Sequence, residues 1–207
     1  MPPIYHFTHG RNLASILADG ELRPSATAGT TVDIADAKIK TSRESRVVTC
    51  GPGGFVGEYV PFYFAPRSPM LFRIQQGGVE GVDGDPRGLV YFATTTERVE
   101  AAGLRWVFTD GNAAAAVTRF FDDIDQLAEI VDWPLMAATY WSNTTEDGDR
   151  VRRRGSEFLV HGVVPLAVID EIGVYDAAAQ ARAREILVEA GTVLTVNVRQ
   201  DWYFSRR

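Results

Sequence analysis

Three histidines are the first residues whose type suggests chemistry. His6, His9 and His161 could ligate a metal ion, but His6 and His9 fall on opposite faces of a predicted strand, or one lies past its end. No third ligand is placed beside them, and the sequence has no HExxH or CxxC motif. We therefore predict no metal site.

The single cysteine and the glycines that follow it are the next candidates. Cys50 could supply a thiolate nucleophile, but it lies in a glycine-rich loop and nothing else marks it for that role. The string GPGGFVGEY that follows has no Lys-Ser/Thr pair and no preceding hydrophobic strand, so it is neither a Walker loop nor a Rossmann fingerprint. We interpret it as a flexible hinge. One cysteine also excludes an intramolecular disulfide.

The remaining candidates are scattered along the chain. They are a strand histidine with a nearby threonine, an arginine in a basic run, a strand tyrosine and a late glutamate: His6, Thr8, Arg43, Tyr63 and Glu157. Singly, each has an ordinary interpretation, because a strand histidine is usually a satisfied core residue and a glutamate at a strand start is usually solvated. Their combination is what makes them candidates for a site.

Short strands and a few helices must position these residues. Strands are predicted over Ile4–Thr8, Tyr59–Ala65, Leu71–Gln75, Gly88–Ala93, Arg105–Thr109, Glu157–His161, Ala167–Tyr175 and Val193–Val198. Helices are predicted over Asn12–Asp19, Thr96–Ala102, Asp122–Val131 and Ala177–Ala190. Pro61 suggests that its strand is at an edge or near its start. No repeat or linker divides the chain, so residues 1–207 are expected to form one α+β domain.

Two segments have weak periodicity. Residues 24–58 are rich in Thr, Ser, Ala and Gly and carry Lys38, Lys40, Arg43 and Arg46, which predicts a functional loop or a lid. Residues 142–155 are polar and are also predicted to be a loop.

Composition limits the class of protein. The 207 residues are 45% hydrophobic and 23% charged, which excludes a disordered chain. The net charge, 21 − 27 = −6, argues against a protein coated in basic charge for duplex DNA, although a local basic groove stays open. No targeting or membrane segment is visible, and we expect a cytoplasmic protein without a membrane partner.

Longer strings point to a family. YHFTHGRNLASILADGEL, YVPFYFAPRSPM, WVFTDGNAAA and RRRGSEFLV occur in this order, and DWYF closes the chain at Asp201–Phe204. The sequence resembles, over essentially its whole length, the DarT family of DNA ADP-ribosyltransferase toxins from DarTG toxin–antitoxin systems. The resemblance implies a single-domain ADP-ribosyltransferase-like α+β fold, with a split mixed or antiparallel sheet and peripheral helices. It also implies NAD+ as co-substrate, single-stranded DNA as acceptor and a DarG-like macrodomain antitoxin as partner. We expect a monomer.

The resemblance also assigns roles to residues. It implies that Glu157 and Arg43 are catalytic, with Arg46 as the second choice for the arginine. It implies NAD+ contacts from His6, Thr8, Asn12, Arg43 and Tyr63, where Asn12 faces the ribose or phosphates and Tyr63 walls the nicotinamide. Some relatives carry a histidine two residues after the aspartate of VFTDGNA, where this chain has Asn112, and the role of that side chain stays open.

The chemistry of such a transfer fits these residue types. Cleaving the glycosidic bond of NAD+ passes through an oxocarbenium-like state, and nicotinamide leaves as a neutral molecule without a general acid. A carboxylate such as Glu157 would stabilise the positive charge on the ribose. Arg43 would clamp phosphate or the transition state and orient the base, and either residue could assist loss of the acceptor proton.

DNA contacts are expected just before the catalytic glutamate. The residues are a run of arginines, two aromatic residues and one more distant arginine: Arg150, Arg152, Arg153, Arg154, Tyr140, Trp141 and Arg46. A solvated basic turn is the alternative interpretation of the run. The region 132–156 would select the acceptor, which must be unstacked to enter the site. Thymidine within a short sequence motif is expected, and guanine is the alternative.

Two other functions stay open at this stage. One is a transferase that modifies a protein side chain, which would keep His6, Tyr63 and Glu157 but would not need the arginines at 150–154. The other is a catalytically inactive module that binds NAD+ or nucleic acid.

Overall fold

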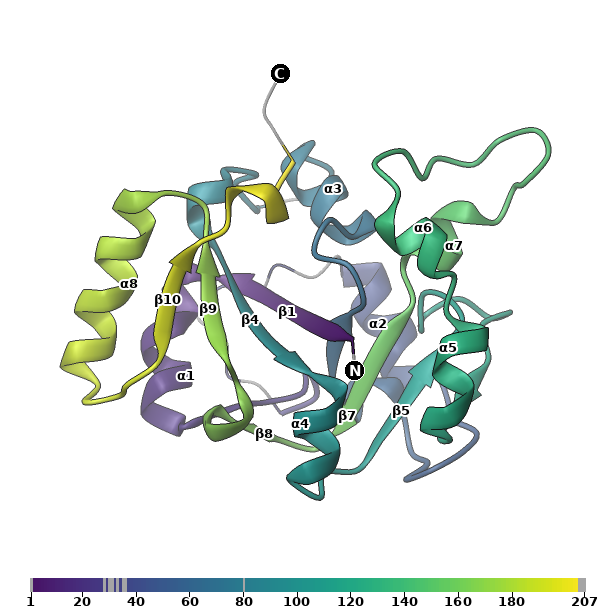
Figure 1. Cartoon of the computed structure of the whole chain (residues 1–207), viewed down its shortest axis with the longest axis horizontal. Helices are drawn as coiled ribbons and strands as arrows, with labels where there is room; N and C mark the ends of the chain where they lie inside the picture. The colour runs from purple at the N-terminus through teal and green to yellow at the C-terminus, as the bar shows by residue number, and fades with distance from the viewer. Residues whose placement is uncertain are drawn as a thin grey trace.

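A twisted eight-stranded sheet organises the computed structural model, which describes residues 2–27, 29, 32, 34, 37–79 and 81–204. Figure 1 shows the sheet crossing the molecule, with helices on both sides. The strand order is β10 (Thr195–Val198), β9 (Glu171–Val174), β4 (Leu89–Thr95), β1 (Pro3–His9), β3 (Tyr59–Tyr63), β7 (Glu157–His161), β5 (Trp106–Thr109) and β6 (Phe120–Phe121). β10 and β9 are parallel and the other neighbours are antiparallel, so the sheet is mixed, as expected.

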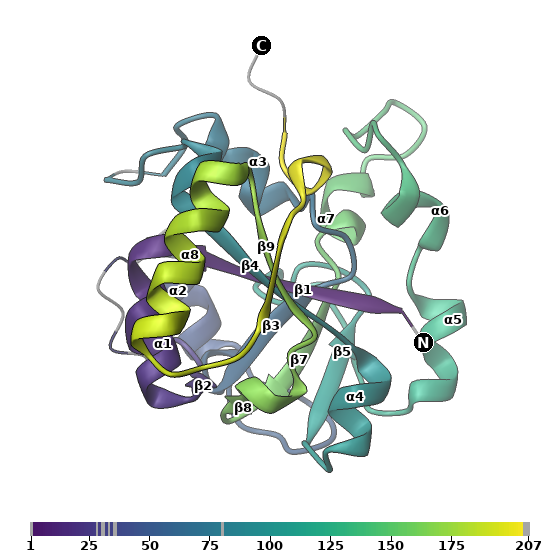
Figure 2. The same ribbon diagram turned by 60° about the vertical axis from the view of Figure 1, so that its left-hand side comes forward.

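Helices cover the two faces of the β10–β1 half of the sheet. On one face, α1 (Leu13–Asp19) and α8 (Ala177–Glu189) lie side by side and bury Leu17 and Leu187 in the main core (Figure 2). On the other, α3 (Pro69–Gln75) and the C-terminal Tyr203 pack against Phe7 of β1. Strand side chains alternate between the faces, so β1 contributes to both cores. This double burial fixes the register of β1, which carries His6 and Thr8.

The sheet is split between β1 and β3. β1 pairs with β4 along its whole length, but with β3 only where Tyr5 lies opposite Tyr63. At the split, the Pro61 carbonyl accepts a hydrogen bond from Nδ1 of His6, at 2.8 Å. The N–H and C=O of one strand residue point to the same side of the strand. Because the Pro61 carbonyl points into the split, the N–H that proline lacks would also point there, where no neighbouring strand needs it for pairing. Pro61 therefore lies inside the sheet, and the edge expected from the sequence is an internal seam.

Two predicted elements are wrong. The segment Leu71–Gln75, expected as a strand, is most of helix α3, because Ser68 caps Leu71 N–H at 3.2 Å and Pro69 begins the helix. The basic loop contains helix α2 (Ala37–Ser45), so Arg43 lies on a helix. The rest of the predicted lid includes residues 28, 30, 31, 33, 35 and 36, which lie outside the described residues.

The other predicted elements are largely confirmed. α1 ends at Gly20, whose φ is 72°, and α4 (Thr96–Ala101) forms where a helix was expected. Ile124–Gln126 and α5 (Leu127–Ile130) occupy the expected Asp122–Val131 helix as a 3-10 turn followed by one α-turn. The predicted 142–155 loop ends in a short helix, α7 (Arg150–Arg154), and α6 (Trp133–Ala137) precedes it. A small sheet joins β2 (Glu21–Leu22) to β8 (Val164–Pro165).

Within the described part of the chain, no helix has both the length and the apolar character that a membrane crossing requires.

Candidate active site

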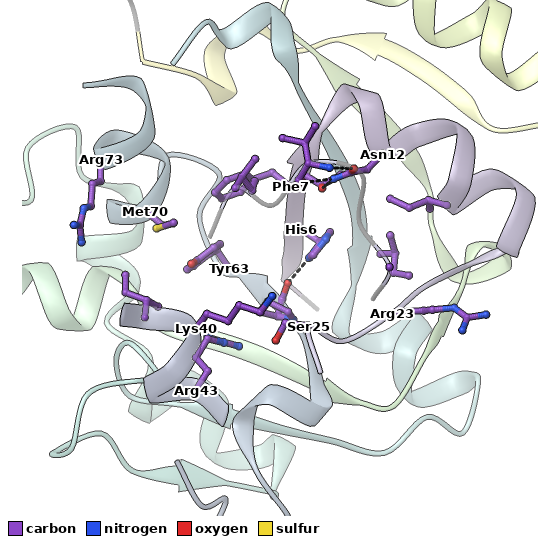
Figure 3. A pocket seen from close by; sticks show the side chains of 18 of the residues that line it. His6, Phe7, Asn12, Arg23, Ser25, Lys40, Arg43, Tyr63, Met70 and Arg73 are labelled. Carbon is purple, nitrogen blue, oxygen red and sulfur yellow. Dashed lines mark hydrogen bonds between the residues drawn. The ribbon is translucent and has the colours of Figure 1, made fainter. Parts of the chain in front are cut away.

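A cavity of about 430 Å³ opens at the split between β1 and β3. Figure 3 shows α2 contributing Lys40 and Arg43 on one side, α3 contributing Met70 and Arg73 on another, and β1 crossing behind. All five residues predicted to contact NAD+ line this cavity: His6, Thr8, Asn12, Arg43 and Tyr63. The structure thus brings together residues that are up to 57 positions apart, from 6 to 63.

A buried ion pair lies beside the cavity. Nη1 of Arg43 is 2.8 Å from Oε2 of Glu157, and the two side chains are 10% and 0% exposed. Oε1 of Glu157 accepts the backbone N–H of Ala113 at 3.0 Å. Nη2 of Arg43 is buried with no partner among the described residues. An orphan guanidinium N–H at a cavity wall is a donor held ready for a ligand acceptor.

The chain around Glu157 holds its carboxylate in place. Thr109, at the end of β5, accepts the Glu157 N–H at 2.9 Å and donates to the Gly111 carbonyl at 2.7 Å. Glu157 begins β7 and lies opposite Tyr63 of β3. It is absent from the described lining of the cavity, whereas Arg43 is part of it. The carboxylate therefore meets the cavity through Arg43.

His6 is fixed as a neutral imidazole. Its Nδ1 must carry the proton, because the Pro61 carbonyl at 2.8 Å can only accept. Desolvation in the protein interior and, to a smaller extent, the nearby Arg43 charge together lower the pKa of His6 to about 4, despite the opposing effect of the Pro61 hydrogen bond. The ring keeps a partial opening to the cavity. Nε2 is therefore left as an acceptor on the cavity side of a rigid strand.

Asn12 is used differently from the expectation. Its Nδ2 donates to Oγ1 of Thr8 at 3.0 Å and to the Val32 carbonyl at 2.8 Å, while its Oδ1 accepts the Val32 N–H at 2.9 Å. Both amide hydrogens of Asn12 donate to other groups of the protein. Asn12 shapes the cavity wall by holding Val32 at the start of α1. Its amide was expected to face ribose or phosphate, but it has no free N–H left to donate to them.

Tyr63 lines the cavity, and its predicted contact with nicotinamide stays a prediction. Its ring stacks on Phe7 with centroids 6.0 Å apart and planes 23° apart. Burial, with the Glu157 charge as a second cause, raises the pKa of the Tyr63 phenol. The phenol is therefore neutral, and the wall presents a π face and a hydroxyl to whatever occupies the cavity.

The prediction that Arg154 contacts DNA is wrong. Arg154 is 2% exposed, and its guanidinium donates to the carbonyls of Arg67, Leu135 and Met136. Burial lowers its pKa to about 10, a mark of the desolvation cost that these carbonyls offset. A side chain enclosed in this way cannot reach a phosphate.

The other arginines of the run are also occupied. Arg152 forms ion pairs with Asp110 at 3.0 Å and Asp149 at 2.7 Å. Arg153 pairs with Asp147 at 2.6 Å and Asp132 at 3.4 Å. Arg150 donates to the carbonyls of Tyr140 and Ser142. The run is neither a free phosphate-binding strip nor a solvated turn, because its side chains fold the 132–155 segment.

The remaining DNA candidates differ in how exposed their side chains are. The prediction of Trp141 as a stacking surface is wrong, because it is buried with its ring edge-on to Phe72 and Phe204. Tyr140 is 82% exposed, so its predicted stacking role stays a prediction. Arg46 donates to the carbonyls of Ala116 and Thr118, which connects the end of α2 to the loop between β5 and β6.

Several site features had no sequence signal. The Ala113 N–H and the Pro61 carbonyl act through the backbone, so their residue types reveal nothing. Thr109 lies in a predicted strand and in the string WVFTDGNAAA, but neither assigned a role to its hydroxyl. The described residues include no group of three or more His, Cys, Asp or Glu side chains able to hold a metal ion.

Known proteins provide a separate line of evidence. The sequence matches the DarT family, described as ssDNA thymidine ADP-ribosyltransferase, over residues 5–204. A DNA ADP-ribosyl transferase of Thermus aquaticus is 37% identical over 207 residues, covering 99% of this chain and 90% of that protein. Thermus sp. 2.9 DarT in complex with ADP-ribosylated ssDNA matches with a TM-score of 0.90 and 35% identity, covering 98% and 96% of the two chains. Its NAD+ complex gives 0.86 and 34%, covering 98% and 97%.

A fusion protein extends the comparison. The DNA ADP-ribosyl transferase-DNA ADP-ribosyl glycohydrolase fusion protein of Thermosipho africanus is 29% identical over 178 residues. The match covers 84% of this chain and 42% of the fusion protein.

Proposed function

The chain belongs to the DarT family of ssDNA thymidine ADP-ribosyltransferases, and from this premise we propose that it transfers ADP-ribose from NAD+ to thymine in single-stranded DNA, releasing nicotinamide. Membership confirms the family resemblance and the ADP-ribosyltransferase-like α+β fold expected from the sequence. It also makes the protein an NAD+-dependent DNA ADP-ribosyltransferase. The observation that carries the proposal to this chain is the buried Arg43–Glu157 pair at a cavity lined by the expected NAD+ residues.

The residue roles follow from the geometry. The cavity at the sheet split would hold NAD+, with His6 Nε2 accepting a ribose hydroxyl and Tyr63 covering the nicotinamide ring. Arg43 would place its free Nη2–H on an acceptor of the bound molecules. Glu157 would stabilise the positive charge that develops on the ribose as nicotinamide leaves. These assignments require the Arg43–Glu157 contact to adjust when the substrates bind, since Arg43 covers the carboxylate.

The acceptor strand would cross the mouth of the cavity. Val151 of α7, Met70 of α3 and Lys40 of α2 line the cavity, and the exposed Tyr140 offers a ring for a neighbouring base. A base must leave its stack to enter, which favours single-stranded DNA. The folded 132–155 segment would select thymidine within a short sequence motif. We treat residues 1–207 as one transferase domain that acts as a monomer.

A DNA-modifying activity of this kind suggests a toxin with a dedicated reversal partner. The fusion protein of Thermosipho africanus joins a related transferase to a DNA ADP-ribosyl glycohydrolase in one polypeptide. We propose that a DarG-like macrodomain antitoxin serves this chain, and that both act in the cytoplasm, where the DNA is.

Labelling with radioactive NAD+ tests the function. The protein is incubated with matched single-stranded oligonucleotides that carry thymine or lack it, and with cellular protein. We expect label on the thymine oligonucleotides, and mass spectrometry should find ADP-ribose on thymine. Label on guanine would support the alternative acceptor, and label on protein alone would overturn the DNA proposal. NAD+ binding without any label would indicate an inactive binding module.

A further inference from the structure

Asn112 is held rigidly in the turn that follows β5. Its backbone N–H donates to the Arg152 carbonyl at 3.0 Å, and its carbonyl accepts the Ala115 N–H at 3.0 Å. Its side-chain Oδ1 accepts the Ala114 N–H at 2.9 Å. Three hydrogen bonds therefore fix the backbone and the amide plane of one side chain at the cavity wall.

The orientation of this amide is determined. The Ala114 N–H can only donate, so the atom that faces it must be the oxygen, and Nδ2 must occupy the opposite end. Nδ2 has no hydrogen-bond partner among the residues that the structure describes, and Asn112 is partly exposed and lines the cavity. The protein thus holds an amide donor in position for a ligand.

The turn that carries this donor also binds the carboxylate of Glu157. Ala113, the next residue, donates its N–H to Oε1 of Glu157, whereas Arg43 binds Oε2. The residue next to Asn112 and the Arg43 side chain therefore bind the two different oxygens of Glu157. Both line the cavity, and both carry N–H groups without a partner in the described chain: Nδ2 of Asn112 and Nη2 of Arg43.

Close packing keeps the turn in place. A Cβ on Gly111 would lie 2.2 Å from Nη1 of Arg152, and a Cβ on Gly155 would lie 3.3 Å from Cβ of Asn112. Glycine is needed at Gly111 because an added carbon would displace the Arg152 guanidinium, and Arg152 holds Asp110 and Asp149. The position of Asn112 is thus coupled to the 132–155 segment.

We propose that Nδ2 of Asn112 reads the acceptor base by donating to one of its carbonyl oxygens, which deepens the proposed function and rests on it. In a thymidine nucleotide N1 carries the sugar, so N3 is the ring nitrogen with a proton, and a carbonyl flanks it on each side. Two donors that flank Glu157 match this carbonyl–NH–carbonyl pattern, with Asn112 on one carbonyl and Nη2 of Arg43 on the other. Guanine presents one carbonyl and one amino group beside its N1, so one donor would meet another donor.

The same contacts assist the transfer. The bond from N3 to the ribose anomeric carbon forms as the bond from that carbon to nicotinamide breaks, with the electron pair leaving on nicotinamide. The N3 proton passes to the Glu157 carboxylate. Negative charge that grows on the imide during proton loss spreads to its two carbonyl oxygens, where fixed N–H donors stabilise it. The donor of Asn112 therefore serves both recognition and rate.

Two substitutions at this position test the reading. Asn112→Asp keeps the oxygen that accepts the Ala114 N–H but replaces the donor with an acceptor, and Asn112→Ala removes the amide. We expect kcat/KM for the thymine oligonucleotide to fall roughly 10- to 100-fold in Asn112→Ala and further in Asn112→Asp. The affinity for NAD+ and the melting temperature should stay close to wild type. Val193→Asp adds the same charge on the exposed turn after α8 and should leave kcat/KM unchanged.

Modified bases identify the contact itself. Oligonucleotides with 2-thiothymidine or 4-thiothymidine replace one carbonyl at a time with a weaker acceptor. Replacing the carbonyl that contacts Asn112 should lower kcat/KM of the wild-type protein. The same replacement should have little further effect in Asn112→Ala, so that the two changes are non-additive. Additive effects with both thio bases, or unchanged kcat/KM in Asn112→Asp, would overturn the inference.

The proposed function can fail separately. If wild-type protein labels no thymine oligonucleotide, the proposed acceptor is wrong, and the reading of thymine by Asn112 fails with it. If wild type labels thymine while the Asn112 variants match it, the inference alone fails.

Discussion

At the scale of single residues, the buried pair of Arg43 and Glu157 carries the largest desolvation cost of the site. Each charge loses its hydration on burial, and the pair is stable only because the other partner and the Ala113 N–H replace that hydration. Removing one partner leaves the other as an uncompensated buried charge. Substitutions here therefore change both activity and stability, and the two effects must be measured together.

Glu157→Gln should separate these effects better than alanine. Glutamine can still accept the Ala113 N–H, but it cannot balance the Arg43 charge or take a proton from the base. We expect DNA labelling to fall at least about 100-fold and the free energy of unfolding to fall by about 3 kcal/mol. Rate assays and urea denaturation of the same preparation measure the two losses. Labelling at the wild-type rate would remove Glu157 from catalysis.

His6 predicts a specific pH dependence of stability. The unfolded histidine titrates near 6.5, whereas burial lowers the pKa of folded His6 to about 4. Below pH 6.5 the unfolded chain binds a proton that the folded protein does not, so stability is lost as pH falls from 6.5 to about 4. The loss should reach at most about 3 kcal/mol more than in His6→Gln, measured by denaturation across this pH range. Parallel curves for the two proteins would contradict the assignment of a neutral His6.

At the scale of elements, the 132–155 segment is held by arginines as well as by the contacts of Met136 and Trp133 with the main core. Arg154 joins α6, α7 and the chain before α3 through three carbonyls, and Arg152 joins α7 to the turn after β5. α7 leads directly into Glu157 at the start of β7. The segment expected to select the acceptor and the strand that begins at Glu157 are therefore one continuous, internally bonded unit.

Arg154→Leu should test this view of the segment. The variant leaves the Met136 and Arg67 carbonyls without their donor and the Leu135 carbonyl with only the Ala138 N–H, so we expect the free energy of unfolding to fall by about 3 kcal/mol. DNA labelling should fall more than NAD+ affinity, because the damaged unit lies on the acceptor side. Arg98→Leu is the control, since Arg98 also donates to two carbonyls but is about half exposed, and it should cost less than about 1 kcal/mol. Equal costs for the two variants would show that burial of Arg154 is unimportant.

The structure also shows what could be predicted from the sequence. The strand that carries His6 follows from its alternating pattern, and the choice of Arg43 and Glu157, which the structure pairs, follows from motif resemblance. Helix α3 was predictable as well, because Ser68 followed by Pro69 is a helix start signal that outweighs a short apolar run. The partners of Arg154 were not predictable, because a run of arginines reads the same whether the guanidinium groups meet water, phosphate or buried carbonyls. Burial of Trp141 likewise depends on Phe72 and Phe204, which are distant in the chain.

At the scale of the whole molecule, the net charge of −6 has a clearer meaning once the ion pairs are known. The arginines at 150–154 that seemed to form a basic strip are bound to carboxylates and carbonyls. Among the residues that the structure describes, the cations that line the cavity are Arg23, Lys40, Arg43 and Arg73. Electrostatic attraction for a DNA strand should therefore be modest, and recognition should depend on the target base.

The salt dependence of DNA affinity measures this directly. If at most about three cations contact phosphates, the slope of log K against log salt should be no steeper than about −2 for single-stranded DNA. Fluorescence anisotropy with labelled oligonucleotides, using Glu157→Gln to prevent turnover, provides the slope. A slope near −4 or steeper would mean that the arginines at 150–154 leave their partners to bind the strand.

The self-bonded 132–155 segment has a consequence for evolution and engineering. Most of its hydrogen bonds and ion pairs begin and end inside it. Its outside contacts gather at a few places: Asp110 and Asn112, Thr118, the Arg67 carbonyl, and the rings that pack on Trp133 and Trp141. A segment that carries its own scaffold can be exchanged as a cassette without redesign of the sheet behind it. New acceptor preferences could then arise by swapping this cassette between relatives, while the nucleotide-binding half of the enzyme remains unchanged.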